Sequence, residues 1–262
     1  MDKKYWHTQT VDKPLFPNIE WSRPEQKSQA GKLGIIGGNE TGFACVSESF
    51  SDAIKIGVGE VKILLPDNLK KAMPDTITNV IYGASNLSGG LAKQSIDEMR
   101  ALSVWATGIL LIGDAGRNSE TAILYEEFIK GYNGPLTITR DAIDLIKNNP
   151  TELIERPNTL IVASFAQLQK IFQNAYYPKV LTFNMQLSNL VETLHKFTIT
   201  YPVAIAVFFQ DQIIIAYDSQ VTTTPYSDPM KIWRGTTATY AASYWLWNLT
   251  KPLESATASL LN

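Results

Sequence analysis

The 262-residue sequence has little of what several classes of protein require. It contains one cysteine, Cys45, and two histidines, His7 and His195, which lie far apart in the chain. A single cysteine excludes an internal disulfide and a cysteine-based zinc site, and it favours a reducing compartment. Neither histidine has a second histidine or a cysteine at helical spacing, and we predict no metal site. We expect His7 to lie in a mobile N-terminal arm and His195 on a helix surface.

Excess charge and long apolar runs are also absent. The net charge is -2, with lysine and arginine scattered along the chain, which gives no electrostatic case for binding nucleic acid or an acidic membrane surface. Residues 1–30 are polar and interrupted by prolines, unlike a signal peptide. The longest apolar run, 203–209, is far shorter than the ~20 residues of a membrane span. We therefore expect a cytoplasmic protein without nucleic-acid or membrane partners.

Strand-like and helix-like segments alternate along the chain. Buried strands are predicted at 33–36, 61–65, 79–82, 108–113, 136–139 and 159–162. Helices are predicted between them and beyond, at 43–54, 92–102, 119–129, 141–147, 165–172 and 187–194. Residues 203–209 and 212–217 are predicted to form a β-hairpin, followed by a closing helix at 236–249.

This alternation predicts an α/β protein. We expect a mostly parallel central sheet with helices on both faces and an antiparallel hairpin at its edge. No segment is rich enough in proline, glycine or serine to act as a linker between two globular parts. The predicted organisation is an N-terminal arm, 1–30, and a single α/β domain, 31–262.

The first polar segment after a predicted strand is the turn at Gly37, Gly38 and Asn39, followed by Thr41 and Gly42. Open α/β sheets bind ligands at such turns. The spacing does not fit the G-x-G-x-x-G pattern of dinucleotide-binding proteins or the Gly-Lys-Ser/Thr end of a phosphate-binding P-loop. Either the glycines serve only a tight turn, or Gly38, Asn39 and Thr41 contact a ligand.

A second polar loop follows the clearest buried strand. It contains Gly113, Asp114, Gly116 and Arg117, and its position predicts that it shares a sheet edge with the first turn. Asp114 and Arg117 either bind a polar ligand or pair with each other, and an ion pair is the favoured interpretation. Ser119 is expected to cap the helix that follows.

A third segment begins the helix predicted at 141–147. Asp141 is expected to cap this helix through its carboxylate, and Asp144 to lie on the same helical face. The alternative is that Asp141 contacts a substrate or acts as an acid/base.

The fourth segment, at the start of the closing helix, is the best candidate for an anion site. It comprises Arg234, Gly235, Thr236 and Thr237. A turn that opens a helix offers free backbone N–H groups and a positive dipole end, and Arg234 adds charge. The alternative is a helix cap made by Thr236 or Thr237. The β-branched Thr237 restricts the backbone where a second glycine would make a better phosphate cradle.

In order and spacing, the four segments resemble those of the ribokinase-like, ADP- or ATP-dependent NAD(P)H-hydrate dehydratases. Residues 37–39 correspond to the Gly-Gly-Ser-type turn of that family. Residues 113–117 correspond to its Gly-Pro-Gly-Leu-Gly-Arg loop, one residue shorter and without the proline. Residues 138–144 keep only the second aspartate of a Leu-Asp-Ala-Asp-Ala-Leu-Asn segment. Nothing polar at 162–167 matches the family's Thr-Pro-His-Pro-Gly-Glu segment.

The family's final Ala-Gly-Thr-Gly-Asp turn falls on residues 234–238, where Ala238 replaces the aspartate. In such enzymes this aspartate is the acid/base for phosphoryl transfer to the hydrate hydroxyl, and loss of phosphate then restores the nicotinamide ring. Losing a positioned acid/base commonly lowers the rate ~100- to 10,000-fold. The catalytic residue of this chain is therefore unknown, with Asp141 as the candidate substitute.

The resemblance implies a three-layer ribokinase-like fold that uses ADP or ATP, with Mg²⁺, and an NAD(P)H-like small molecule. The implied nucleotide-binding residues are Arg234, Gly235, Thr236 and Thr237. The implied substrate-binding residues are Gly38, Asn39, Thr41, Gly113, Asp114, Gly116, Arg117 and Asp141. Three functions stay open: an active dehydratase or related small-molecule kinase, a non-catalytic nucleotide- or ligand-binding relative, and, with least support, a dinucleotide-dependent oxidoreductase.

Aromatic residues gather in the predicted closing helix. Tyr240, Tyr244 and Trp247 fall on one helical face. Packing in the core is the default interpretation, and a subunit interface is the alternative, because tyrosine and tryptophan are enriched in interfaces. Related enzymes are often homo-oligomers, so we expect the chain to self-associate.

Overall fold

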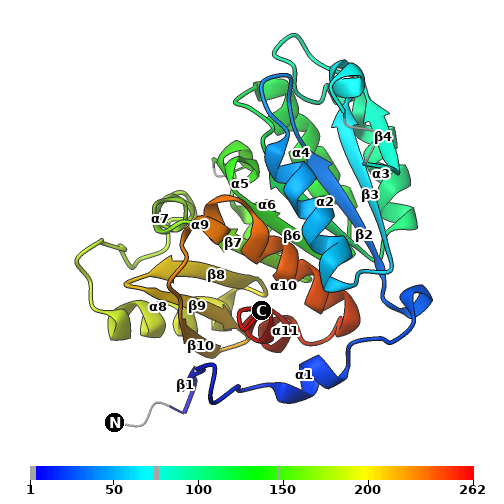
Figure 1. Ribbon diagram of the computed structural model, residues 1–262. Helices are drawn as coiled ribbons and strands as arrows, with labels where there is room; N and C mark the ends of the chain where they lie inside the picture. Colours follow the sequence, from blue (N-terminus) through cyan, green and yellow to red (C-terminus); the bar gives the residue numbers. More distant parts are fainter. Residues whose placement is uncertain (1–3, 74–76, 147) are drawn as a thin grey trace.

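The computed structural model describes residues 4–73, 77–146 and 148–262. Within these residues, ten strands form one sheet in the order β1-β10-β9-β8-β7-β6-β5-β2-β3-β4 (Figure 1). The strands are β1 (Trp6–Thr8), β2 (Lys32–Gly37), β3 (Glu60–Pro66), β4 (Val80–Gly83), β5 (Gly108–Gly113), β6 (Leu136–Thr139), β7 (Thr159–Ala163), β8 (Ala204–Phe209), β9 (Gln212–Tyr217) and β10 (Gln220–Pro225).

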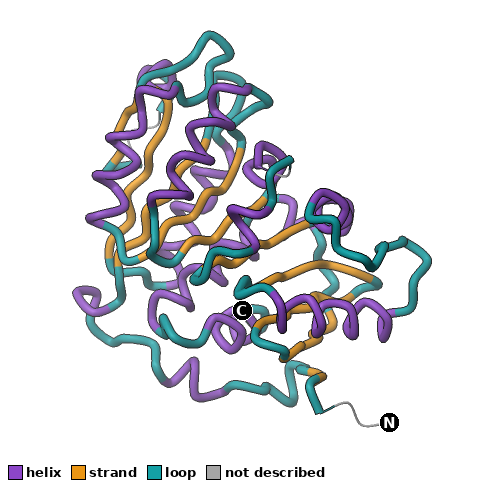
Figure 2. The backbone as a smooth tube through the Cα atoms, turned by 180° about the vertical axis from the view of Figure 1, so that it is seen from behind, coloured by secondary structure: helices purple, strands orange, loops and turns teal. Residues whose placement is uncertain are grey.

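Helices cover both faces of the sheet, as Figures 1 and 2 show from opposite sides. On one face lie α3 (Ile96–Trp105), α4 (Ser119–Gly131), α5 (Asp141–Ile146), α6 (Thr151–Ile154), α7 (Phe165–Asn174) and α8 (Leu187–Thr200). On the other lie α1 (Pro17–Trp21), α2 (Ala44–Ile56), α9 (Met230–Trp233), α10 (Thr236–Trp247) and α11 (Pro252–Ser259). In the described part of the chain, no helix is long and apolar enough to cross a bilayer.

Short 3-10 turns complete the helical segments: η1 (Lys27–Gln29), η2 (Asp67–Lys71) and η3 (Lys93–Ser95). The helix predicted at 92–102 begins with η3 and continues as α3. Lys147, the expected last residue of the helix at 141–147, lies outside the described residues.

The central strands are apolar on both sides because each side faces a helical layer. Successive side chains of a strand point to opposite faces of the sheet. Leu110 of β5 therefore packs in the core layer shared with α2 and α10, whereas Leu111 packs in the layer shared with α4 and α5. This two-sided burial explains the near-continuous apolar strands of the sequence.

The sheet is parallel from β4 to β8 and antiparallel from β8 to β10. Gln210 and Asp211 join β8 to β9 with φ values of 48° and 58°, the left-handed pair of a two-residue hairpin turn. The predicted hairpin is thus confirmed. Asp218 and Ser219 make a second such turn, with φ of 44° and 63°, into β10, a strand that the sequence analysis missed.

β2 marks the point where the strand order reverses. It pairs in parallel with β3, the next strand of the chain, on one side and with β5 on the other. Loops that leave neighbouring strands on either side of such a point separate and open a crevice at the carboxyl ends of the strands. The polar segments after β2, β5 and β6 all lie at this edge.

The N-terminal segment differs from the mobile arm that we expected, since β1 extends the sheet. His7 lies in β1, which pairs in parallel with β10. The Tyr5 ring stacks on the His195 ring, with centroids 3.7 Å apart and planes 8° apart. His195 is consequently half-buried on α8, with Nδ1 2.5 Å from the Ser219 carbonyl oxygen. The division into an arm and one domain stays a prediction.

The C-terminal aromatic residues pack within the chain. Tyr244 is 0% exposed, and its hydroxyl donates to the Glu20 carboxylate. Trp247 Nε1 donates to the Ala30 carbonyl oxygen at 3.1 Å. The predicted closing helix ends at Trp247, two residues early, and Pro252 begins a further helix that the sequence analysis missed. Self-association of the chain stays a prediction.

Replacing Gln9 by leucine tests whether the N-terminal segment is part of the packed core. Gln9 is 0% exposed; its Nε2 donates to the Thr257 carbonyl at 2.7 Å, and its Oε1 accepts from the Leu15 N–H at 3.2 Å. Gln9→Leu removes both hydrogen bonds at a fully buried position and leaves the Leu15 N–H without its side-chain acceptor, so we expect the free energy of unfolding to fall by about 1–3 kcal/mol in chemical denaturation. The control, Gln26→Leu at an exposed position, should change it by less than about 0.5 kcal/mol. Equal stability of the two variants would contradict this packing.

Candidate functional site

Asn39 ties the turn after β2 to the loop after β5. Its Nδ2 donates to the Asp114 carbonyl oxygen at 2.5 Å, and its Oδ1 accepts from the Thr41 N–H at 2.7 Å and from the Thr41 hydroxyl. Gly38 donates its N–H to the Gly113 carbonyl at 2.9 Å and adopts φ 83°, a left-handed conformation that favours glycine. Gly38 therefore has a structural role in the turn, and Asn39 joins the turn to the loop after β5.

Asp114 pairs with Arg140, so the predicted Asp114–Arg117 pair is wrong. Arg140 Nη2 lies 2.6 Å from Asp114 Oδ1, and the Cys45 N–H donates to Asp114 Oδ2 at 2.9 Å. Asp114 and Arg140 both adopt left-handed backbone conformations, with φ of 53° and 56°, which bring the two strand-end loops to face each other. Arg117 is exposed and makes no ion pair with any described residue.

The helix after this loop is capped by Asn118 rather than by Ser119. The Asn118 Oδ1 accepts from the Glu120 N–H at 2.8 Å, and Ser119 is the first residue of α4. The expected cap was therefore displaced by one residue. Both side chains are of the type that favours an N-cap, and the sequence alone does not choose between adjacent candidates.

Asp141 binds the loop after β5 instead of capping its own helix. Its carboxylate accepts backbone N–H groups from Asp114 at 2.7 Å, Ala115 at 3.0 Å and Gly116 at 3.2 Å. Burial raises the pKa of Asp141, and the N–H groups of Asp114 and Gly116 oppose that shift by stabilising the charged form. Gly113, at φ 97°, has no room for a side chain, because a Cβ would collide with Asp141 Oδ1.

Gln167 is a site residue that the sequence analysis missed. Its Nε2 donates to the Arg140 carbonyl at 2.7 Å and to Asp144 Oδ2 at 3.1 Å. With Ser164 it forms a capping box at the start of α7. The Ser-x-x-Gln spacing of residues 164–167 is the signal that predicts such a box, and it places this glutamine at a strand end.

The amino end of α10 is open. Gly235, at φ 87°, is the N-cap residue, no side chain caps the helix, and the first turn contains no acidic residue. The alternative, a cap made by Thr236 or Thr237, is therefore wrong. Thr237 instead shares a 3.1 Å hydrogen bond with the Tyr226 hydroxyl.

Arg140 lies against this open helix end. Its Cδ is 3.5 Å from where a Cβ of Gly235 would stand. Its Nε is buried and has no hydrogen-bond partner in the described structure. A guanidinium and the positive end of a helix dipole are thus adjacent, and Asp114 supplies the ion-pair partner of the guanidinium.

Ala238 points into the core and not toward the site. It is 0% exposed and belongs to the apolar layer between α10, α2 and the sheet. Thr236, two residues earlier, is half-buried at the first position of the helix. A carboxylate at position 238 of this backbone would be enclosed by apolar side chains.

Two adjoining cavities lie beside these residues. A cavity of about 210 Å³, here called the strand-end cavity, is lined by Asp114, Arg140 and Asp141 among others. A second cavity of about 660 Å³, the outer cavity, includes Arg117 in its lining. The two cavities share four lining residues: Asp144, Ser164, Gln167 and Trp233.

The structure thus brings together some of the predicted residues and separates others. Asp114, Asp141 and Arg117 line the two cavities, whereas residues 38–41 are not among the lining residues of either cavity. Residues 234–237 follow Trp233 directly but are not among the lining residues of either cavity. Among the described residues, no group of three or more histidine, cysteine, aspartate or glutamate side chains is arranged to hold a metal ion.

Comparison with known proteins finds similarity in structure only. No protein-family model and no curated protein matches the chain. A ribokinase-like superfamily protein from Enterococcus faecalis superposes with a TM-score of 0.76 at 13% identity, over 100% of this chain and 87% of that protein. A hypothetical protein from Streptococcus mutans gives 0.72 at 13% identity, over 93% and 85%.

A third solved structure is an ADP/ATP-dependent NAD(P)H-hydrate dehydratase from Bacillus subtilis, co-crystallised with ATP and Mg²⁺. It superposes with a TM-score of 0.62 at 11% identity, over 94% of this chain and 85% of that one. Identities this low show the fold alone. The chain has the ribokinase-like fold, with the mostly parallel sheet and antiparallel edge that the sequence predicted.

Introducing an aspartate at position 238 tests whether that position belongs to the core. We expect Ala238→Asp to lower the free energy of unfolding by about 2–4 kcal/mol, because the charge is buried without a partner. Thr236→Asp is the matched control, since it places the same charge at the same helix end in a half-exposed position. There the helix dipole should stabilise it by about 0.3–1 kcal/mol. Chemical denaturation of both variants measures the difference; a fully stable Ala238→Asp variant would contradict the burial argument.

Proposed function

We propose that this chain binds the phosphates of ADP or ATP at the amino end of α10, and that it is a relative of the NAD(P)H-hydrate dehydratases with weak or no catalysis. The observation that carries the proposal is the open end of α10, with Arg140 against Gly235. The binding of ATP and Mg²⁺ by a structural neighbour of the same fold supports it.

The charges at this end of α10 favour an anion. The first N–H groups of an α-helix have no partner within the helix and carry the positive end of its dipole. No side chain caps α10, and no acidic residue in its first turn balances the dipole. Arg140 and the exposed Arg234 add two cationic side chains, of which Arg140 keeps a buried Nε without a partner. A phosphate group would satisfy these donors together.

Magnesium would bind together with the nucleotide, through its phosphates. Mg²⁺ is usually held by one or two carboxylates together with substrate phosphates and water. Asp114 is already paired with Arg140, and Asp141 with three backbone N–H groups. The third carboxylate that lines the strand-end cavity, Asp144, accepts from Gln167 Nε2 at 3.1 Å and would face such an ion through water.

Weak or absent catalysis follows from the position of Ala238. The dehydratase reaction needs an acid/base beside the phosphates, and here that position holds a methyl group packed in the core. The carboxylates of Asp114 and Asp141 are both engaged in contacts that fix the loops. Under this proposal, the chain keeps the ribokinase-like fold and the anion site but lacks the acid/base carboxylate.

A thermal-shift titration with ADP and ATP, with and without Mg²⁺, tests nucleotide binding. A ligand that binds only the native state stabilises it by about 2.7 kcal/mol at a hundredfold excess over Kd. We expect a shift of this kind with wild-type protein, and a Kd about two- to fivefold weaker for Arg234→Gln, whose lost charge is exposed. The control is Arg100→Gln, an exposed arginine on α3 paired with Glu127. The absence of a shift with every nucleotide would refute the binding site.

Turnover of hydrated NADH in the presence of ADP or ATP tests the catalytic part of the proposal. We expect a rate lowered ~100- to 10,000-fold from that of an enzyme with its acid/base in place, or no turnover, when the return of NADH is followed. Turnover near the enzyme median of about 10 per second would show an active enzyme instead.

A further inference from the structure

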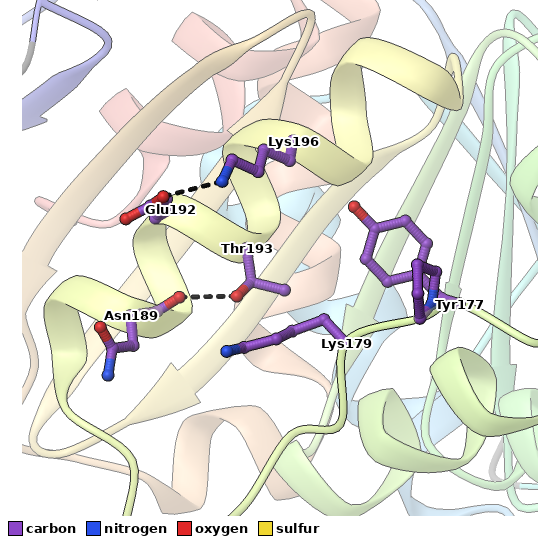
Figure 3. Close-up of a pocket in the computed structure, with 7 residues that line it drawn as sticks. Tyr177, Lys179, Asn189, Glu192, Thr193 and Lys196 are labelled. Atoms are coloured by element: carbon purple, nitrogen blue, oxygen red, sulfur yellow. Dashed lines mark hydrogen bonds and ion pairs between the residues drawn. The ribbon is translucent and has the colours of Figure 1, made fainter.

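A line of cavities follows α7 away from the strand-end site. The outer cavity shares Ala166 and Lys170 with a further cavity of about 600 Å³ on the flank of α7. That cavity shares Tyr177 and Lys179 with another of about 350 Å³ against α8, shown in Figure 3. We call these three adjoining cavities the α7 groove.

The segment between α7 and α8 forms the outer wall of this groove. It projects away from the sheet in Figure 1. Gln169 of α7 holds it at one point, where Nε2 donates to the Leu181 carbonyl at 2.8 Å. In Figure 3, Tyr177 and Lys179 come from this segment and lie across the cavity from α8. The groove thus has a rigid helix on one side and a tethered loop on the other.

Cationic side chains line the groove. Arg117, Lys170 and Lys179 make no ion pair with any of the residues that the structure describes. At the far end, Lys196 is paired with Glu192 at 2.8 Å, as Figure 3 shows. On the inner side, Asp144 is the acidic lining residue. Three unpaired cations therefore follow one another along the groove of a chain whose net charge is -2.

Their spacing suits an elongated ligand. α7 has 10 residues, which corresponds to a length of about 15 Å at 1.5 Å per residue. Arg117 lines the outer cavity, Lys170 lies in the second half of α7 between the outer cavity and the next one, and Lys179 lies beyond the end of α7. Trp233, which precedes the open end of α10, lines the outer cavity as well. A single molecule could therefore reach from the α10 end into the groove.

We propose that the α7 groove is a second phosphate-binding subsite, so that the ligand of this protein is an elongated organic polyanion with a phosphate at each of two separated positions. One phosphate position lies at the end of α10 and the other beside Lys170 and Lys179. This inference rests on the proposed nucleotide site. It specifies two further properties of the ligand, namely its elongated shape and a negative charge at its far end. Long-range attraction by the three cations would also speed the encounter with such a ligand.

Binding of a short and two long probes to the full chain tests the proposal. The short probe is ADP; the long probes are NADP⁺, which carries a phosphate away from its diphosphate, and NAD⁺, which lacks it. By isothermal titration, Lys179→Gln and Lys170→Gln should each weaken NADP⁺ binding by about three- to fivefold, the size of an exposed charge contact, and leave ADP and NAD⁺ unchanged. Lys179→Arg should keep the wild-type affinity for NADP⁺ because it keeps the charge.

Lys130→Gln is the control, because Lys130 is an exposed lysine on α4 that pairs with Glu152 outside the groove. NADP⁺ binding that is unaffected by Lys170→Gln and Lys179→Gln would overturn the second subsite and leave the nucleotide site intact if ADP still binds. An equal loss for ADP and NADP⁺ would also overturn it, since the lysines would then act on the diphosphate. Failure of all three probes to bind wild-type protein would overturn the nucleotide site and, with it, this inference.

Discussion

The carboxylate of Asp141 holds the strand-end loops of this protein in place. It accepts the backbone N–H groups of residues 114–116, which turn inward at the end of β5. A loop that bends so sharply exposes N–H groups in a concave arrangement suited to an anion. Here the chain supplies that anion itself. The left-handed conformation of Asp114 then directs its side chain to Arg140 and to the Cys45 N–H, so one carboxylate sets the position of the next.

This arrangement determines where a ligand anion fits. Because the N–H groups after β5 are already satisfied by Asp141, they are not open to a phosphate. The open donors are at the amino end of α10, on the opposite side of Arg140. Arg140 is held by Asp114 on one side and contacts the Gly235 turn on the other. It therefore couples the acidic loop network to the cationic end of the helix, and a bound phosphate would compete with Asp114 for the same guanidinium.

The sequence was sufficient for the core of the fold because the parallel strands are apolar on both faces, and glycines mark where they end. It was insufficient for β10 (Gln220–Pro225), whose run of threonines lacks the apolar pattern and becomes a strand only through pairing with β9 and β1. At the site, glycine positions were predictable from local backbone needs. The Asp114–Arg140 pair was not, because it joins two loops through left-handed conformations that no local pattern signals.

Ala238 shows that the proposed anion site does not depend on a carboxylate at position 238. In the first turn of α10, the backbone and the side chain at position 238 have different roles. Its backbone N–H groups would bind the proposed anion whichever side chains are present. Its side chain at 238 faces the layer shared with α2, where an apolar group adds to packing. Because a methyl group occupies that layer, a carboxylate there would lower stability, so the packing opposes an acid/base at this position. The backbone site is under no such constraint, because the helix dipole and the Gly235 turn are properties of the fold.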